Sequence, residues 1–401
     1  MYKSKVKYKF KRKIKLNMRK FTLLLSFICL QTLLSAQSSP TGTIVSGGLT
    51  REYRLYVPAA YNAATPVPLL FNLHGYGSNN LEQDFYGNFK QIADTANFII
   101  AMPNGTFDNQ GKRYWNNFIP NSGVDDVAFI SNLLDTLRSI YNIDLDRVYS
   151  TGMSNGGFMS YELAAQLNNR IAAIASVAGD MITPKLNALN PARPVPVMEI
   201  HGNADATVPY DGLPASAFAP IENVVNKWVT LNHCNPTPTV TDVPNTNTSD
   251  GCTATHYVYG GGDQGSTVEF YKINGGGHTW PGAAFNIGVT NMDINASIEI
   301  WRFLRKYRLS QFPTATLEAA NTPDWQLFPN PATNHFTLQS EDASKAVRVR
   351  VFDAQGRLVS TIQAPNENTI SVPVNNWLSG WYGVLLETEN GVRNMKVFVG
   401  K

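Results

Sequence analysis

The alternation of apolar and polar residues divides residues 42–307 into strand-like and helix-like segments. Apolar residues recur at intervals of three and four from Val127 to Tyr141, behind Asp125 and Asp126 as possible helix caps, and SIEIWRFLRKY repeats this pattern. Short apolar or β-branched runs, several ending in glycine, predict buried strands: TREYRLYVP, PVPLLFNLHG, FIIAMPNG, RVYSTG, AAIASVAG, PVPVMEIHG and TVEFYKING. Strands that alternate with helices predict an α/β domain over residues 38–308, with a mostly parallel sheet covered by helices on both faces.

The pattern changes near residue 309. Residues 309–325, LSQFPTATLEAANTPDW, are typical of a linker. Residues 326–401 show only strands and turns, as in HFTLQS, AVRVRVFDAQGRLVS, TISVPV and GWYGVLLET. This pattern predicts a second domain, a small all-β sandwich.

The first 36 residues have the three parts of a secretory signal peptide. A basic stretch from Lys3 to Lys20 precedes the apolar run FTLLLSFICLQTLL, and Leu34-Ser35-Ala36 offers a cleavage site. Met18 is an alternative start, because the sequence after it is a complete signal by itself. The other interpretation is an uncleaved membrane anchor, but the apolar run is short for a membrane span. We therefore expect export, with no stable membrane span after cleavage.

Removal of this leader changes the charge and the cysteine count. Ten of the 33 Lys and Arg residues lie in the leader, so 23 basic side chains face 30 acidic ones in the remainder, a net charge near −7. This balance argues against a nucleic-acid partner. Cys234 and Cys252 remain, and an even pair in an exported protein predicts a disulfide. Two free thiols, or half of a metal site, are the alternatives, although no further suitably spaced ligand supports a metal.

The stretch STGMSNGG, residues 150–157, lies between a predicted strand and a predicted helix. A serine hydroxyl becomes a nucleophile when a base takes its proton and its oxygen stands clear of the sheet. A sharp strand-to-helix turn presents Ser154 in this way, and it crowds the residues two before and two after, here Gly152 and Gly156.

An acid and a base should follow a nucleophile of this kind in the order Ser, acid, His. Asp205 follows the strand of MEIHGNADATVPY, with Asp211 as a rival, and His278 follows the strand of VEFYKINGGGHTWPG. A turn carboxylate and a surface histidine are the plain alternatives. Their order after strands instead predicts a Ser154–His278–Asp205 triad, a mechanism that requires no metal and no cofactor.

Two backbone N–H groups should stabilise the oxyanion. The Asn155 N–H directly follows the nucleophile. The second donor is expected from the glycine-rich turn of FNLHGYGSN, where we predict the Tyr76 N–H, with Gly77 as the alternative.

These motifs together resemble a known family. LHGYG, GMSNGG, HGNAD with VPY, and GGGHTWPG are similar to carbohydrate esterase family 1, which contains polyhydroxybutyrate depolymerases, feruloyl esterases and acetyl xylan esterases. The resemblance covers roughly residues 42–307. It implies an α/β-hydrolase fold with Ser154 as nucleophile, Asp205 as acid and His278 as base.

The same resemblance bears on four more residues. It supports the Cys234–Cys252 pairing, because cysteines flank the same region in relatives. RYWNN resembles a segment that places an aromatic residue near the pocket, so Trp115 and Trp280 are candidate substrate contacts, with core packing as the alternative.

The C-terminal segment resembles the sorting domains of the type IX secretion system. LFPNPATNHFTL, VRVFDAQGRLV and LSGWYGVLLETENGVRNMKVFV carry this similarity. It implies that the secretion machinery is a partner and that the protein reaches the cell surface or the medium through the periplasm. A carbohydrate-binding sandwich is the alternative.

We therefore expect a secreted serine esterase that removes feruloyl or acetyl groups from xylan-type polysaccharide. Depolymerisation of polyhydroxybutyrate is the second-ranked activity. The expected substrate is therefore an esterified polysaccharide or a polyester. An inactive carbohydrate-binding protein on a hydrolase scaffold and a peptidase of the same fold are further alternatives.

Overall fold

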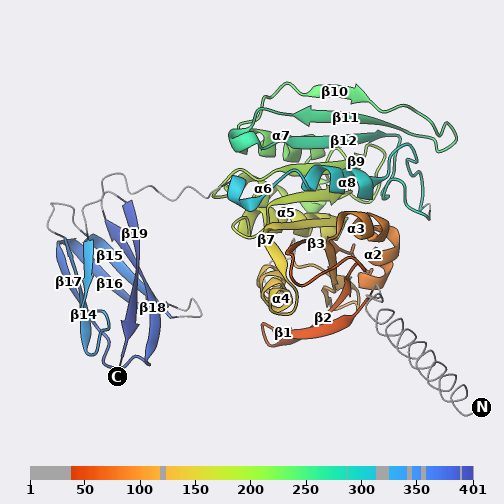
Figure 1. Ribbon diagram of the computed structural model, residues 1–401. Helices are drawn as coiled ribbons and strands as arrows, with labels where there is room; N and C mark the ends of the chain where they lie inside the picture. Colours follow the sequence, from red (N-terminus) through yellow and green to blue (C-terminus); the bar gives the residue numbers. More distant parts are fainter. Residues whose placement is uncertain are drawn as a thin grey trace, which may run out of the picture. The chain divides into compact units, whose positions relative to one another are not determined.

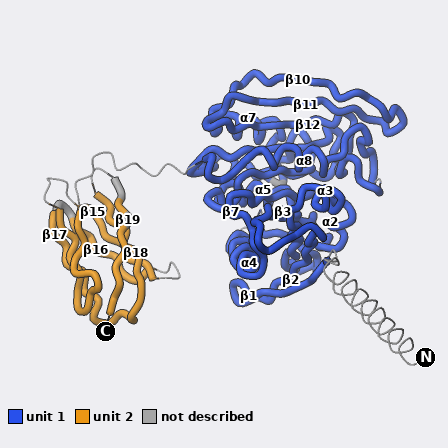
Figure 2. Tube along the Cα trace, viewed as in Figure 1, with its two compact units in different colours: residues 1–313 blue, residues 314–401 orange. Residues whose placement is uncertain are grey.

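The computed structural model describes residues 38–117, 123–285, 287–312, 325–340, 346–353, 358–388 and 391–400. The chain divides into two compact units, residues 1–313 and residues 314–401 (Figure 2). The expected signal peptide and most of the expected linker lie outside the described residues. Within the described residues, no helix is both long enough and apolar enough to cross a membrane.

The first unit is built on a ten-stranded sheet in the order β1-β2-β4-β3-β7-β8-β9-β12-β11-β10, with β1 and β10 at opposite edges (Figure 1). The central strands from β4 to β12 pair in parallel, whereas the outer strands pair antiparallel. The strands are β1 Thr41–Ser46, β2 Leu49–Tyr56, β3 Val67–Leu73, β4 Ile99–Pro103, β7 Ile143–Met153, β8 Ala173–Val177, β9 Val197–Gly202, β10 Thr239–Asp242, β11 Thr253–Tyr259 and β12 Val268–Asn274.

Helices cover both faces of this sheet, as the sequence predicts. Phe129, Met159 and Trp228, from α4, α5 and α7, pack on one face. Ala93 and Phe303, from α3 and α8, pack on the other face. The helices are α2 Asn80–Tyr86, α3 Lys90–Ala96, α4 Asp126–Ile140, α5 Asn155–Gln166, α6 Thr183–Ala188, α7 Ile221–Leu231 and α8 Ala296–Leu304; three short 3₁₀ turns occupy Pro214–Ser216, Asp263–Gly265 and Leu309–Gln311.

The local sequence explains these elements. All seven residues of β3 are buried, which fits a central strand with helices on both sides. Asp125 caps α4, because its side chain accepts a hydrogen bond from the Ala128 N–H. A parallel core sheet with helices on both faces, in this strand order and with a sharp turn after β7, is the α/β-hydrolase fold.

The edges of the sheet differ from the prediction. The strands β1, β10 and β11 were not predicted, and they add antiparallel pairs to the mostly parallel sheet. All four residues of β10 are exposed, so this strand carries no apolar alternation that the sequence pattern could reveal. A separate two-stranded hairpin, β5 Thr106–Phe107 with β6 Arg113–Tyr114, also escapes the pattern.

The second unit is all-β, as predicted. One sheet has the order β13-β14-β17 and the other β16-β15-β18-β19. Their inner faces share a core that includes Trp325, Phe336 and Val349. The strands are β13 Trp325–Phe328, β14 His335–Ser340, β15 Ala346–Phe352, β16 Leu358–Glu367, β17 Thr369–Pro373, β18 Gly380–Thr388 and β19 Gly391–Val399.

Candidate active site

Ser154 occupies the turn between β7 and α5. Its backbone has φ 54° and ψ −122°, a conformation that a residue with a side chain rarely adopts outside a constrained turn. A Cβ on Gly152 would lie 2.5 Å from the Gly156 carbonyl carbon, and a Cβ on Gly156 would lie 2.2 Å from the Leu73 carbonyl oxygen. The turn therefore needs both glycines, as the sequence argument requires.

The structure brings Asp205 and His278 together from loops 73 residues apart in the chain. His278 Nδ1 lies 2.7 Å from Asp205 Oδ2. Because a carboxylate only accepts, Nδ1 donates, and Nε2 is the nitrogen left for a proton from a nucleophile. Asp211, the rival acid, is exposed and makes no such contact.

Close backbone approach allows the two loops to meet. A Cβ on Gly202 would lie 2.2 Å from the Gly276 carbonyl oxygen, so the end of β9 and the loop after β12 touch through glycine. Gly276, one of the three glycines before His278, is therefore part of this close approach.

Asp205 is buried and held as an anion. Its Oδ1 accepts the N–H groups of Thr207 and Val208, each at 2.8 Å. Burial alone would raise the pKa of Asp205, but the hydrogen bond and charge of His278, with help from His201 and the Val208 N–H, lower that pKa below its usual value. An ionised Asp205 can fix the His278 ring in one tautomer.

The structure discriminates between the two candidates for the second oxyanion donor. The Gly77 N–H donates to the Arg113 carbonyl oxygen at 2.7 Å and is therefore engaged. This contact favours Tyr76, which lines the same cavity as Ser154. The first expected donor, Asn155, opens α5 directly after Ser154, where N–H groups lack partners within the helix.

His74, for which the sequence predicts no role, supports residues 74–77, the turn that is expected to carry the second oxyanion donor and is called the oxyanion turn below. Its buried Nδ1 lies 2.7 Å from the Gly75 carbonyl oxygen, and its Nε2 accepts the Gly105 N–H at 2.9 Å. Burial lowers the pKa of His74 to about 4, so the ring stays neutral with its proton on Nδ1. The LHGYG motif contains His74 directly before Gly75, and this position is the sequence feature that could have indicated its supporting role.

The prediction that Trp115 contacts the substrate is wrong, because its side chain is fully buried and does not line the cavity that contains Ser154. Its indole Nε1–H donates to the His74 carbonyl oxygen at 2.9 Å, and its backbone N–H donates to Asn155 Oδ1. Asn117 also bonds the Asn155 side chain. Trp115 therefore braces both segments that carry the expected oxyanion donors.

Trp280 also departs from its predicted role. Its side chain is buried and does not line the cavity that contains Ser154, but it lines a second, smaller cavity of about 220 Å³ beside Tyr86. Its backbone N–H bonds the Tyr86 hydroxyl at 3.0 Å and its indole bonds the Ser297 hydroxyl at 3.2 Å. Trp280 thus positions Tyr86, which does line the cavity.

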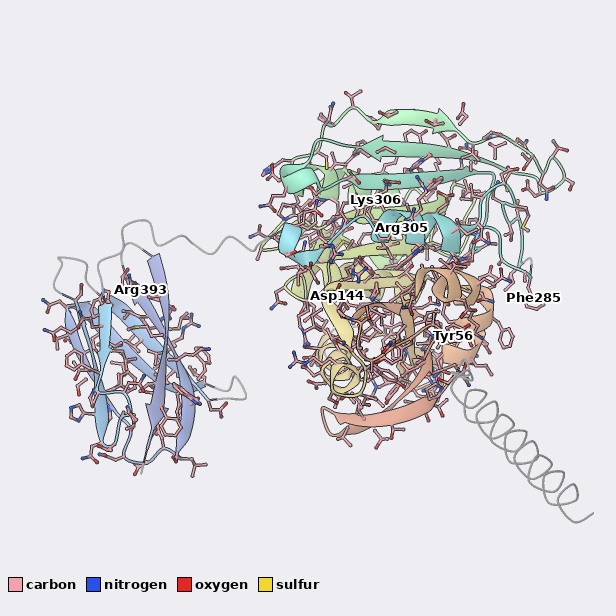
Figure 3. The ribbon with its side chains drawn as sticks, in the orientation of Figure 1. Tyr56, Asp144, Phe285, Arg305, Lys306 and Arg393 are labelled. Carbon is pink, nitrogen blue, oxygen red and sulfur yellow. The ribbon has the colours of Figure 1, made fainter. Side chains whose placement is uncertain are left out.

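The cavity beside Ser154 and His278 has a volume of about 690 Å³. Apolar side chains dominate its wall, and Phe85, Phe285 and Ile287 remain 56%, 62% and 63% exposed at its rim. Figure 3 shows Phe285 at the periphery of the first unit, in the loop between β12 and α8. The other lining residues are Gly75, Tyr76, Ser78, Glu82, Gln83, Tyr86 and Met153.

The predicted disulfide is wrong: Cys234 and Cys252 are both free and buried. Cys234 packs on one face of the sheet and Cys252 on the other. They also lie at opposite ends of β11, since Cys234 is beside the Ser266 carbonyl and Cys252 directly precedes the strand. Seven strand residues span roughly 23 Å, far beyond the ~7 Å limit for the Cα atoms of a disulfide.

No group of three or more His, Cys, Asp or Glu side chains in the described ranges is arranged to hold a metal ion.

Two family models match the chain. The first, described as esterase PHB depolymerase, matches residues 51–217 and so includes the oxyanion turn, Ser154 and Asp205. The second, described as a secretion system C-terminal sorting domain, matches residues 326–400. The sorting domain indicates a protein that is secreted or held at the cell surface.

Curated relatives are similar to the first unit. A putative esterase NocK from Nocardia uniformis subsp. tsuyamanensis is 30% identical and covers 60% of this chain and 74% of its own. A probable feruloyl esterase C from Aspergillus flavus is 33% identical and covers 49% and 73%. A bifunctional acetylxylan esterase/xylanase XynS20E from Neocallimastix patriciarum is 30% identical over 58% of this chain, which spans only 31% of that protein's length.

Proposed function

The chain belongs to the esterase family of polyhydroxybutyrate depolymerases and feruloyl esterases, and from this premise we propose that it is a secreted serine esterase with a Ser154–His278–Asp205 triad. The 2.7 Å contact between His278 Nδ1 and Asp205 Oδ2, beside a serine on a strained turn, is the observation that carries the proposal. Signal-peptide export followed by the type IX machinery is the proposed route out of the cell.

The reaction is a two-step acyl transfer. Ser154 Oγ attacks the ester carbonyl while His278 Nε2 takes its proton, and Asp205 stabilises the imidazolium that forms. The N–H groups of Asn155 and Tyr76 stabilise the oxyanion, and removal of one such donor typically costs about 10²–10³ in rate. His278 then protonates the leaving alcohol, and water releases the acid from Ser154. The residues need no metal or cofactor for these steps.

The cavity supports a bulky acyl group. A volume of about 690 Å³ with a mainly apolar wall far exceeds the needs of an acetyl group and suits an aromatic acid. We therefore propose feruloyl-type esters on xylan as the main substrate, with acetyl esters as smaller substrates of the same site. An inactive carbohydrate-binding protein on the same scaffold would not need a contact between Asp205 and His278. The presence of this contact therefore argues against that alternative.

The rim favours one second candidate, a polyester such as polyhydroxybutyrate. Phe85, Phe285 and Ile287 are each more than half exposed and together form an apolar edge that could lie on a hydrophobic polymer.

A substrate panel tests the proposal. The full-length protein, with Ser154→Ala as the blank, is incubated with feruloylated arabinoxylan, acetylated xylan and a polyhydroxybutyrate film, and the released acid is quantified. We expect ferulate release to exceed acetate release and to vanish in the blank. Release of 3-hydroxybutyrate alone would replace the main substrate with the polyester, and equal activity of the blank would end the assignment.

A further inference from the structure

A buried polar group outside the triad lies directly behind Asp205. Glu199 and His201, both on β9, have side chains that are 1% and 0% exposed. His201 Nδ1 lies 3.0 Å from Glu199 Oε1, and the other oxygen of Glu199 accepts the Tyr161 hydroxyl at 2.8 Å. Burying a titratable side chain destabilises the folded state unless the side chain is paired. The burial of this pair therefore calls for an explanation.

The opposite side of the His201 ring faces the loop that carries the catalytic acid. Nε2 lies 2.9 Å from the Val208 carbonyl oxygen and 3.5 Å from Asp205 Oδ2. The Val208 N–H in turn donates to Asp205 Oδ1. His201 therefore holds both ends of the short turn between Asp205 and Val208.

The partners define the protons on this ring. A carbonyl oxygen only accepts, so Nε2 carries a proton. Nδ1 faces a carboxylate, so it also carries a proton unless Glu199 holds that proton instead. Asp205, an ionised carboxylate beside Nε2, favours the cation on His201.

On these contacts we propose that Glu199 and His201 form a buried ion pair that positions Asp205: the doubly protonated His201 ring, held by Glu199, fixes Asp205 from behind while His278 binds it from the front. The inference rests on the proposed triad. His201 and Glu199 do not reach the cavity, so they are positioning residues and not catalytic residues.

The surrounding charges are consistent with this assignment. Burial opposes the charge on His201, but the hydrogen bond and charge of Glu199, with the charge of Asp205, outweigh it and raise the pKa of His201. Burial raises the pKa of Glu199, and the hydrogen bond and charge of His201 offset only part of that rise. The other titratable groups around the ring are Asp180, whose pKa burial raises to about 8, together with Tyr161 and Tyr210.

The pair should affect the charge around the proposed triad. His201 and His278 approach the same oxygen of Asp205 at 3.5 Å and 2.7 Å, so a cation on His201 adds positive charge beside the reacting groups. Replacement of Glu199 by Gln leaves His201 neutral and removes that cation. The pKa that governs the acid limb of kcat/KM should then rise by about half a pH unit, after allowing for the lost Glu199 charge.

The pH profile of kcat/KM for 4-nitrophenyl acetate tests this shift in the full-length protein. Glu199→Gln should move the acid limb to higher pH, whereas Tyr161→Phe, which alters the same buried group but keeps the Glu199–His201 contact, should not. Coincident acid limbs for Glu199→Gln and the wild type would overturn the positioning role.

A second measurement does not depend on activity or on the stability of Glu199→Gln. In the ¹⁵N-histidine-labelled Ser154→Ala protein, both His201 ring nitrogens should be protonated at pH 7, with the signals assigned by their loss in His201→Gln. An unprotonated Nδ1 would place the proton on Glu199 and overturn the ion pair. If instead Ser154→Ala hydrolyses esters as fast as the wild type, the triad fails, while the nitrogen signals still decide the state of His201.

Discussion

Replacement of Trp115 by Phe should impair catalysis although Trp115 touches no substrate. The indole Nε1–H donates to the His74 carbonyl oxygen at 2.9 Å, and the ring packs against the His74 ring with centroids 5.1 Å apart. Phenylalanine retains an aromatic ring but has no donor. The His74 carbonyl would then lose this partner in a fully buried environment, directly before the oxyanion turn.

The structural cost can be estimated from two effects. A buried acceptor left unsatisfied costs about 1–3 kcal/mol. The smaller ring leaves a void of roughly 40 Å³, which adds about 1 kcal/mol at the usual cost per unit of cavity volume. The free energy of unfolding should therefore fall by about 2–4 kcal/mol. Relaxation of the turn displaces the Tyr76 N–H, and a displacement near 1 Å typically costs up to about 10² in rate.

Steady-state kinetics and urea unfolding of Trp115→Phe measure these effects. We expect kcat to fall by about 10- to 100-fold with little change in KM, because the oxyanion donors act in the transition state. Trp280→Phe is the matched control: it removes an indole bond of 3.2 Å to Ser297, also in the core, and should lose stability without a comparable loss of kcat. Equal kcat values for Trp115→Phe and the wild type would refute the bracing role.

Three further predictions follow from named contacts. Gly156→Ala should lose about 3 kcal/mol and nearly all activity because its Cβ would meet backbone atoms of Leu73, whereas Gly260→Ala, with open space around it, should behave as the wild type in the same unfolding and rate assays. The pKa of His74 is lowered from 6.5 to about 4, so below pH 6.5 the unfolded chain binds a proton that the folded chain refuses; stability should fall by about 2–3 kcal/mol between pH 7 and 4.5, and a His74→Asn variant with an equally steep fall would contradict this. Alkylation after denaturation without reductant should modify both Cys234 and Cys252, and a cross-linked peptide pair would restore the disulfide that the structure excludes.

The interior of the first unit could be predicted because burial on one or both faces of an element leaves a pattern of apolar residues in its own sequence. The fully buried run in β3 and the three-and-four spacing of α4 are direct consequences of where those elements lie. The four residues of the edge strand β10 are all exposed, so its sequence has no apolar alternation that would reveal its pairing with β11. Sheet edges are where sequence patterns carry the least information.

The candidate site shows the same division. Strand-to-loop positions and glycine spacing predict Ser154, Asp205 and His278 as the triad; the structure brings Asp205 and His278 into contact, and Ser154 lines the same cavity as His278. The roles of Trp115 and Trp280 could not be read from the sequence, since an aromatic residue that lines a cavity and one that lies behind its wall look alike. The disulfide prediction was wrong for a related reason. An even number of cysteines does not show on which face of the sheet each cysteine lies.

Covalent labelling of Ser154 tests the central claim most directly. The full-length protein is treated with a fluorophosphonate probe, and the modified residue is identified by peptide mass spectrometry. The account predicts one adduct, on Ser154, formed together with loss of ester hydrolysis, and no adduct in Ser154→Ala. An adduct on another serine, or hydrolysis that persists in fully labelled protein, would contradict the claim that Ser154 is the nucleophile.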